Sequence, residues 1–267
     1  MVDHVGTFES LSVPTFDMYP KYSYSKRAIS GLIRDVIFAR QRVFRQDAVA
    51  CIERLKPSLQ VLGRENVPQR GPCVVTINHY YRAGFAAQWM ALAVAATIPA
   101  DMHWVMTGEL TYPGRLYASP GRALSHFILH RIAGVYGFTA MPPMPPRPED
   151  TVERAAAVRA VLDVVKSSKA PPIIGLAPEG GDSVDGRLVR PASGLGRFGL
   201  LLSSAGLKFV PVGAYEAERV FSLHFGAPYE LSVPHDLPAG DKDALAARAI
   251  MEHIAQLLPS HLRGEFA

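Results

Sequence analysis

From residue 58 onward, the chain alternates between short apolar runs and longer segments with helical periodicity. The apolar runs have the length and the β-branched or aromatic content of strands. They are SLQVLG, CVVTIN, MHWVMT, YGFTAM, PIIGLA, KFVPVGAY and VFSLHFGAPYEL. The helical segments span about 83–97, 115–134, 150–168, 194–206 and 241–262. Because parallel strands are usually joined by a helical crossover, this alternation predicts an α/β fold with a largely parallel mixed sheet flanked by helices.

The residues before the first strand have a different pattern. Residues 24–55 are predicted to be helical, which divides the chain into an N-terminal helical, membrane-associating region at 1–56 and an α/β domain at 57–267. Residues 21–45 contain seven basic side chains and one acidic one. In a single helix, the apolar face would hold Ile29, Leu32, Ile33, Val36, Ile37, Val43 and Phe44, and the opposite face Arg34, Gln41, Arg42 and Arg45,. Such a helix either docks on an anionic membrane or packs on its own domain with a solvated basic side.

Composition excludes several classes of protein. A hydrophobic content of 48% and a charged content of 19% are ordinary for globular domains,. Two cysteines without a spaced framework indicate a reducing compartment, no disulfide scaffold and no zinc site,. The start of the chain does not resemble a secretory signal, so we expect a cytoplasmic protein, peripheral on the inner face of the membrane. Basic residues do not recur along the chain, so nucleic acid is not an expected partner.

Polar residues follow two of the predicted strands. Asn78 and His79 follow CVVTI, and the loop PEGGDSVDG at 178–186 follows IIGLA, while a third strand ends at Pro211, Val212 and Gly213. Ligands of parallel sheets bind outside the carboxyl ends of the strands, so the first two clusters mark a candidate site. The alternatives at this stage are a structural histidine at a strand end and a plain surface turn.

In order and spacing, three stretches resemble the glycerophospholipid acyltransferases, typified by 1-acylglycerol-3-phosphate acyltransferases. They are VLGRENVPQRGPCVVTINH, LAPEGGDS and GLKFVPVGAY, and the resemblance covers roughly residues 58–230. It implies that His79 is the general base. The base would take a proton from a lipid hydroxyl, which then attacks the thioester of acyl-CoA or acyl carrier protein. It further implies no cofactor beyond that co-substrate, no metal, and substrate contacts from Asn78, Glu179, Gly180 and Pro211.

The sequence departs from the family pattern at two functional positions. The Asp that follows the family His by five residues corresponds to Gly84, and the Arg after the Pro-Glu-Gly block corresponds to Asp182. A further family Arg has no counterpart in register, since Arg147 comes several residues late. We therefore expect Asp182 to act as the second catalytic residue beside His79, unless it only caps its turn. Arg82 is the expected replacement contact for an acceptor phosphate.

Three functions remain open on the sequence alone. The first is acyl transfer from a thioester to a lysophospholipid or a related lipid at the membrane surface. The second is an acyl- or lipid-binding relative that has little or no turnover, because both the Asp and the Arg are replaced. The third is a thioesterase or lipid hydrolase, in which water takes the place of the acceptor alcohol.

Overall fold

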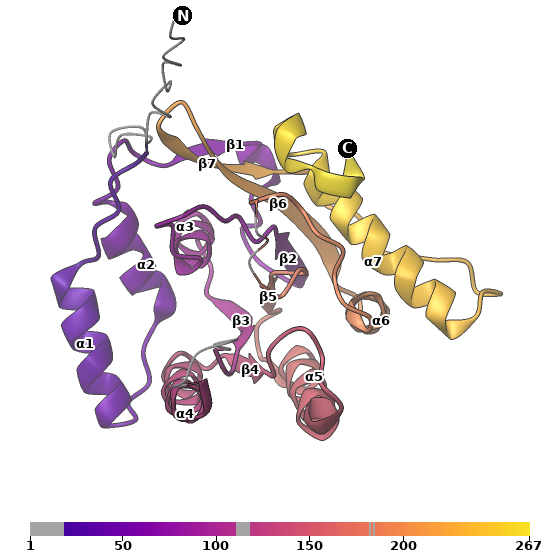
Figure 1. The fold of residues 1–267 in the computed structure, drawn as a ribbon, viewed down its shortest axis with the longest axis horizontal. Helices are drawn as coiled ribbons and strands as arrows, with labels where there is room; N and C mark the ends of the chain where they lie inside the picture. The colour runs from indigo at the N-terminus through magenta and orange to yellow at the C-terminus, as the bar shows by residue number, and fades with distance from the viewer. Residues whose placement is uncertain (1–18, 111–117, 182, 184) are drawn as a thin grey trace, which may run out of the picture.

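The computed structural model describes residues 19–110, 118–181, 183 and 185–267, and its centre is a seven-stranded sheet (Figure 1). The strand order is β1-β7-β6-β2-β5-β3-β4. The strands are β1 Gln60–Leu62, β2 Cys73–Ile77, β3 Met102–Thr107, β4 Thr139–Met141, β5 Ile173–Leu176, β6 Lys208–Ala217 and β7 Val220–Phe225. Every neighbouring pair is parallel except the hairpin of β6 and β7. The predicted α/β fold with a largely parallel mixed sheet is confirmed.

Helices cover both faces of this sheet (Figure 1). They are α1 Lys26–Ile37, α2 Phe44–Ile52, α3 Gln88–Thr97, α4 Ala118–Tyr136, α5 Thr151–Ser167, α6 Leu195–Ser204 and α7 Ala239–Ala255. In the view of Figure 1, α1, α2 and α3 lie on one side of the sheet and α6 and α7 on the other. The N-terminal helices join this body directly, because α2 packs on α3 and α1 contacts α4. The boundary at residue 57 stays a prediction.

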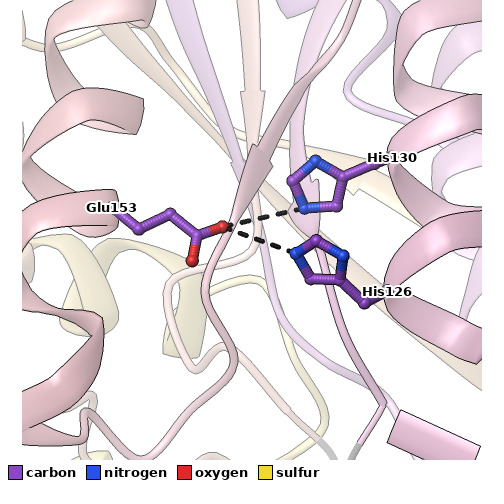
Figure 2. A group of neighbouring side chains, drawn as sticks. All are labelled: His126, His130 and Glu153. Carbon is purple, nitrogen blue, oxygen red and sulfur yellow. Dashed lines mark ion pairs between the residues drawn. The ribbon is translucent and has the colours of Figure 1, made fainter. Parts of the chain in front are cut away.

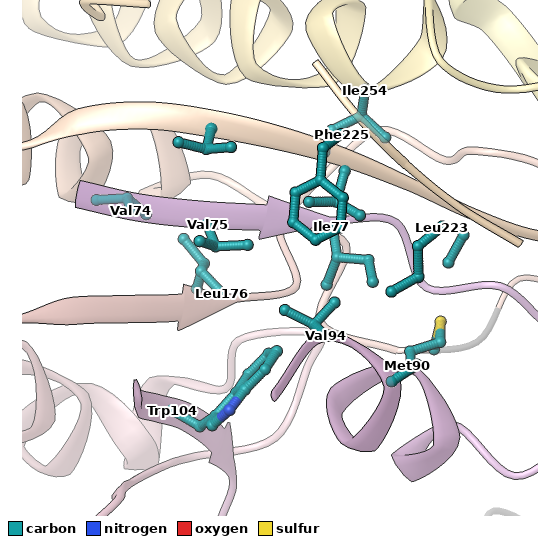
Figure 3. Close-up of a cluster of buried hydrophobic side chains, with 14 of the residues drawn as sticks. Val74, Val75, Ile77, Met90, Val94, Trp104, Leu176, Leu223, Phe225 and Ile254 are labelled. Atoms are coloured by element: carbon teal, nitrogen blue, oxygen red, sulfur yellow. The ribbon is translucent and has the colours of Figure 1, made fainter. Parts of the chain in front are cut away.

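The central strands are buried along their whole length. All residues of β2 and β5 are buried, as expected for parallel strands covered on both faces,. Val74, Val75 and Ile77 of β2 pack with Leu176 of β5, between α3 on one side and Ile254 of α7 on the other (Figure 3). Since β2 is parallel to both β5 and β6, the residues that follow β2 and β5 emerge at one edge of the sheet.

The prediction of one continuous helix through residue 45 was wrong. The helix breaks after Ile37 and resumes at Phe44, and Ala39 has a φ of 50°. Arg42 turns inward and forms ion pairs with Asp35 (2.7 Å) and Asp47 (2.5 Å). The break brings the guanidinium of Arg42 onto both carboxylates, so the proposed basic face does not form as one stripe.

Pro120 lies within α4 and does not interrupt it, although a proline in a helical segment favours a break,. It is the third residue of α4. Proline is tolerated in the first turn of a helix because the N–H that it lacks has no intrahelical acceptor there. The final helix also ends earlier than predicted, at Ala255, and a short 3-10 turn follows at Ser260–Leu262.

Candidate active site

The end of β2 is tied to the neighbouring strand by the side chain of Asn78. Its Nδ2 donates to the carbonyl oxygen of Ala214 (2.9 Å), and its Oδ1 accepts the N–H of Ala214 (2.6 Å). The side chain is buried. An amide that serves a main-chain donor and acceptor across two strands fixes the backbone next to it, so Asn78 positions His79. The expected substrate contact by Asn78 stays a prediction.

The carboxylate of Glu179 joins the two predicted clusters. Its Oε2 accepts the main-chain N–H of His79, and its Oε1 accepts the N–H of Val189 (3.1 Å). Burial raises the pKa of Glu179 to about 7, although both hydrogen bonds favour the ionised form,. The structure thus brings His79 and the Pro-Glu-Gly loop together at the carboxyl edge of the sheet, as the sequence predicted from strand ends alone.

Glycines let this loop approach its neighbours closely. Gly180 has a φ of 70°, and a Cβ atom there would lie 2.4 Å from the Cγ of Met144. Gly186 has a φ of 74°, and its Cβ would lie 2.5 Å from the carbonyl oxygen of Tyr81. The left-handed conformation and the lack of space both require glycine. Gly180 therefore has a structural role whether or not it contacts substrate.

Gly84 is also explained by its backbone. The N–H of Phe85 donates to the carbonyl oxygen of Arg82 (3.0 Å), and Gly84 between them has a φ of 78°. A turn of type II needs a positive φ at its third position, which favours glycine. The position of the family Asp is thus part of a turn that disfavours aspartate. Asp182, the residue expected to compensate, lies outside the described residues.

Arg82 is engaged in an ion pair with Glu216 of β6. Its Nη2 donates to Oε1 of Glu216 (2.9 Å), and its Nε donates to Oε2. The same carboxylate accepts hydrogen bonds from the hydroxyls of Tyr22 (2.6 Å) and Tyr80 (3.1 Å). The Glu216 side chain is only 3% exposed. A phosphate at Arg82 would have to compete with this buried carboxylate, which weakens the expectation that Arg82 replaces the missing arginine.

Two other positions named from the sequence are part of the structural framework. Pro211 is buried within β6, in register with Thr76 of β2, so it lies inside the sheet and below its carboxyl edge. Arg147 donates through Nε and Nη2 to the carboxylate of Asp150 (2.6 and 2.8 Å) and through Nη1 to Glu109 (3.2 Å). Its charge is therefore also balanced within the fold.

A family model described as Acyltransferase matches residues 58–215. The chain belongs to this acyltransferase family. Among solved structures, it is similar to the crystal structure of the 1-acyl-sn-glycerophosphate (LPA) acyltransferase PlsC from Thermotoga maritima, with 12% identity and a TM-score of 0.49. That similarity covers 87% of this chain and 82% of the other. A comparison with curated proteins found no match.

A narrow groove borders the Pro-Glu-Gly loop of this acyltransferase. It has a volume of about 150 Å³ and a largely apolar lining that includes Met106, Val158 and Phe198. Pro178 and Gly180, the two neighbours of Glu179, also line it. Ligand pockets usually measure about 300–1,000 Å³, so this groove can hold only part of a lipid chain.

Among the described residues that line this groove, Arg154 of α5 is the one cation. Its Nη2 donates to the carbonyl oxygen of Pro143 (2.9 Å), and its Nη1 lies 3.5 Å from the sulfur of Met144. No carboxylate of the described residues forms an ion pair with it. Sequence reasoning missed Arg154, although it comes four residues before the apolar Val158 in the predicted helix of about 150–168, and residues at that spacing share one side of a helix,.

A larger hollow lies away from this site, between α1 and α2. Its volume is about 1060 Å³, and its lining includes Arg34, Asp35, Arg42 and Asp47. These four charges pair with one another. We therefore place the chemistry at the strand ends, where the family match and the loop contacts coincide.

Proposed function

We propose that this acyltransferase transfers a fatty acyl group from acyl-CoA or acyl carrier protein to a hydroxyl of a lysophospholipid or related lipid. One observation carries the assignment. His79 follows the central strand within the matched segment, and Glu179 holds its main chain against the Pro-Glu-Gly loop. His79 is half-buried, and Glu179 ties it to a loop whose Pro178 and Gly180 line an apolar groove, a setting that suits a general base with a lipid substrate,.

The proposed reaction uses His79 twice. The neutral imidazole takes the proton of the acceptor hydroxyl while its oxygen bonds to the thioester carbonyl carbon. When the tetrahedral intermediate collapses, the carbon–sulfur bond breaks and the imidazolium returns the proton to the leaving thiolate. The products are an ester and a free thiol. We propose no cofactor beyond the thioester co-substrate.

We further propose that Asp182 is the carboxylate partner of this histidine. Gly84 has no side chain to orient an imidazole or to stabilise its charged form, and the family resemblance brings the Pro-Glu-Gly loop toward His79. A carboxylate within direct or one-water reach would favour the imidazolium that forms during transfer.

Association with the inner face of a membrane is part of this proposal. Ile29, Ile33 and Ile37 of α1 are exposed by 40%, 57% and 64%, and Phe38 is equally exposed at 63%. The adjacent α4 exposes Leu124, Phe127 and Ile128. Such an apolar surface fits a lipid interface, where acyl donors and lysolipid acceptors concentrate. Within the described chain, no helix combines the length and the hydropathy of a transmembrane span.

A second candidate is a lipid-binding relative with little turnover. It is favoured by the turn that fixes glycine at position 84 and by the pairing of Arg82 with Glu216. The first leaves the site without the carboxylate of the family Asp, and the second neutralises the charge of Arg82.

Release of free thiol from acyl-CoA separates these functions. The purified chain is incubated with acyl-CoA and lipid vesicles, with and without a lysophospholipid, and the new ester is followed by mass spectrometry. Transfer requires thiol release that depends on the acceptor and is lost in His79→Ala. Release without acceptor indicates a hydrolase, and binding of acyl-CoA without release indicates the lipid-binding relative. Either of the last two results would refute the proposed transfer.

A further inference from the structure

Three potential metal ligands meet between α4 and α5, apart from His79. His126 and His130 are four residues apart on α4, and Glu153 lies in the first turn of α5. Figure 2 shows both imidazoles pointing toward the carboxylate of Glu153 from the facing helix. One ligand atom from each residue lies within 4.8 Å of the other two. The i, i+4 spacing places both histidines on one face of their helix.

The individual distances are close to those of a coordinated ion. Nε2 of His126 lies 3.9 Å from Oε1 of Glu153, and Nε2 of His130 lies 3.7 Å from the same oxygen. Ligands about 2.0–2.1 Å from a tetrahedral zinc ion are about 3.3 Å from each other. Both His–Glu distances would have to shorten by only a few tenths of an ångström, which small side-chain rotations can supply, to match a coordinated ion.

His130 supplies an independent observation. Its Nε2 is buried and has no hydrogen-bond partner among the described residues. The ring is held against the backbone after β3, because a Cβ atom at Gly108 would lie only 2.8 Å from that nitrogen. A buried ring nitrogen without a hydrogen bond costs free energy unless something binds it. Its direction, toward Glu153, is the direction from which a cation would bind.

Protonation of both imidazoles is unfavourable, because the two positive charges would lie close together. Their rings stack at 4.1 Å between centroids, with an angle of 27°. Neutral imidazole is the form that binds metals, and one divalent ion can replace two mutually repelling protons.

We propose that His126, His130 and Glu153 form a binding site for a divalent transition-metal ion, best suited to Zn²⁺. Two imidazole nitrogens and one carboxylate oxygen form a ligand set typical of zinc, whereas Mg²⁺ and Ca²⁺ prefer oxygen ligands. The side chains are 38–48% exposed, which gives the ion an entry path and leaves a fourth position for water.

A bound ion would hold the elements around the groove in fixed positions. Gly108, on which His130 packs, follows Thr107 of the groove lining, and Glu153 precedes Arg154. Linking α4 to α5 fixes two elements that both flank the edge strand β4. Metal binding does not depend on acyl transfer, so this inference and the proposed function succeed or fail separately. The sequence indicated no metal site, because the ligands come from two helices and include no cysteine.

The test uses the untagged full-length chain after treatment with EDTA and dialysis. Zn²⁺ is titrated by calorimetry, and Co²⁺ is added as a spectroscopic probe. We expect one Zn²⁺ per chain, an increase in melting temperature with Zn²⁺, and the visible absorption of four-coordinate Co²⁺. His126→Ala and Glu153→Gln each weaken Zn²⁺ binding by at least about tenfold. Both positions are solvent-exposed, so these variants are expected to fold.

Matched controls distinguish a built site from adventitious binding. Asp163→Asn changes an exposed carboxylate on the same α5, and His261→Ala removes an exposed histidine elsewhere. Both should bind Zn²⁺ as the wild type does. The inference is overturned if the wild type shows no stoichiometric binding, or if His126→Ala and Glu153→Gln bind no more weakly than the controls.

Discussion

The main-chain N–H of His79 donates to Oε2 of Glu179, and the other oxygen of that carboxylate accepts the N–H of Val189. One buried side chain therefore anchors both the proposed base and the loop that follows β5. Its setting is unusual, because burial raises the pKa of this carboxyl to about 7 while two donors favour its charged form. The anchor consequently changes its protonation close to neutral pH.

The first prediction concerns the pH dependence of stability. The folded-state pKa of Glu179 lies above the ordinary value of 4.5, so the folded protein binds more protons than the unfolded chain between these values. The resulting contribution is complete below pH 4.5 and is lost as the pH rises to about 7. Its upper size is about 3 kcal/mol, from 1.36 kcal/mol per pKa unit. Between pH 4.5 and 8, the free energy of unfolding measured in urea should change less with pH in Glu179→Gln than in the wild type.

Glu53→Gln is the control, since Glu53 is exposed on the surface. Its free energy of unfolding should depend on pH as that of the wild type does. Identical pH profiles for wild type and Glu179→Gln would show that the carboxylate stays ionised in the folded state. Glu179→Ala should be less stable than either at all pH values, because it leaves two N–H groups without their acceptor, at about 1–3 kcal/mol each.

Most elements of the fold were predictable because most strands are apolar runs and most helices are apolar or have an apolar face. β2, β3 and β5 were placed within a residue or two of their ends. The break between α1 and α2 was not predictable, since it depends on Arg42 reaching two carboxylates on different helices. Such contacts leave no local pattern.

The candidate site was predictable only in part. His79 and Glu179 follow strands that are neighbours in a parallel sheet, so their meeting follows from topology. The partners of Arg82 and the position of Arg154 in the groove follow from tertiary contacts. The local sequence does not predict those contacts, apart from the spacing of Arg154 and Val158.

The second prediction tests the base and its proposed partner. His79→Ala should reduce acyl transfer by at least about a hundredfold, the usual contribution of a general base. Stability should change little, because the alanine keeps the N–H that Glu179 accepts. Asp182→Asn should also reduce the rate strongly, and the double variant should be no slower than His79→Ala alone, since residues that act together are not additive. Near-normal turnover in a folded His79→Ala would return this histidine to a structural role.

The third prediction is that Arg82 contributes to stability. Among the described residues, Arg82→Ala leaves the buried Glu216 with two tyrosine donors, and loss of one partner of a buried pair costs about 3 kcal/mol or more,. Urea unfolding of Arg82→Ala, Glu216→Gln and the double variant forms a cycle. We expect the double variant to be more stable than the sum of the single changes predicts. Unchanged stability with a raised KM would instead assign Arg82 to the acceptor.

The fourth prediction assigns recognition of an acceptor phosphate to Arg154. This cation lines the groove without an ion pair to the described carboxylates, and a charge-assisted hydrogen bond contributes about 1.5–3 kcal/mol,. Arg154→Ala should therefore raise KM about tenfold or more for a phosphorylated acceptor but not for monoacylglycerol. Arg159→Ala, on the exposed side of the same helix, serves as the control. An equal loss for both acceptors would mean that Arg154 shapes the groove only.

The last prediction concerns docking through α1. Ile33 and Ile37 are exposed on this helix, next to Arg34, which is 58% exposed at its side chain. Burying one isoleucine stabilises by about 1.5–3 kcal/mol, so Ile33→Glu with Ile37→Glu should reduce partitioning into anionic vesicles by about a hundredfold or more. Leu245→Glu on α7, at the opposite side of the sheet in Figure 1, should bind as the wild type does. High salt should weaken wild-type binding, because basic residues contribute about 1 kcal/mol each near an anionic surface. Flotation of the three proteins with vesicles measures this directly, and equal flotation would show that α1 does not face the membrane.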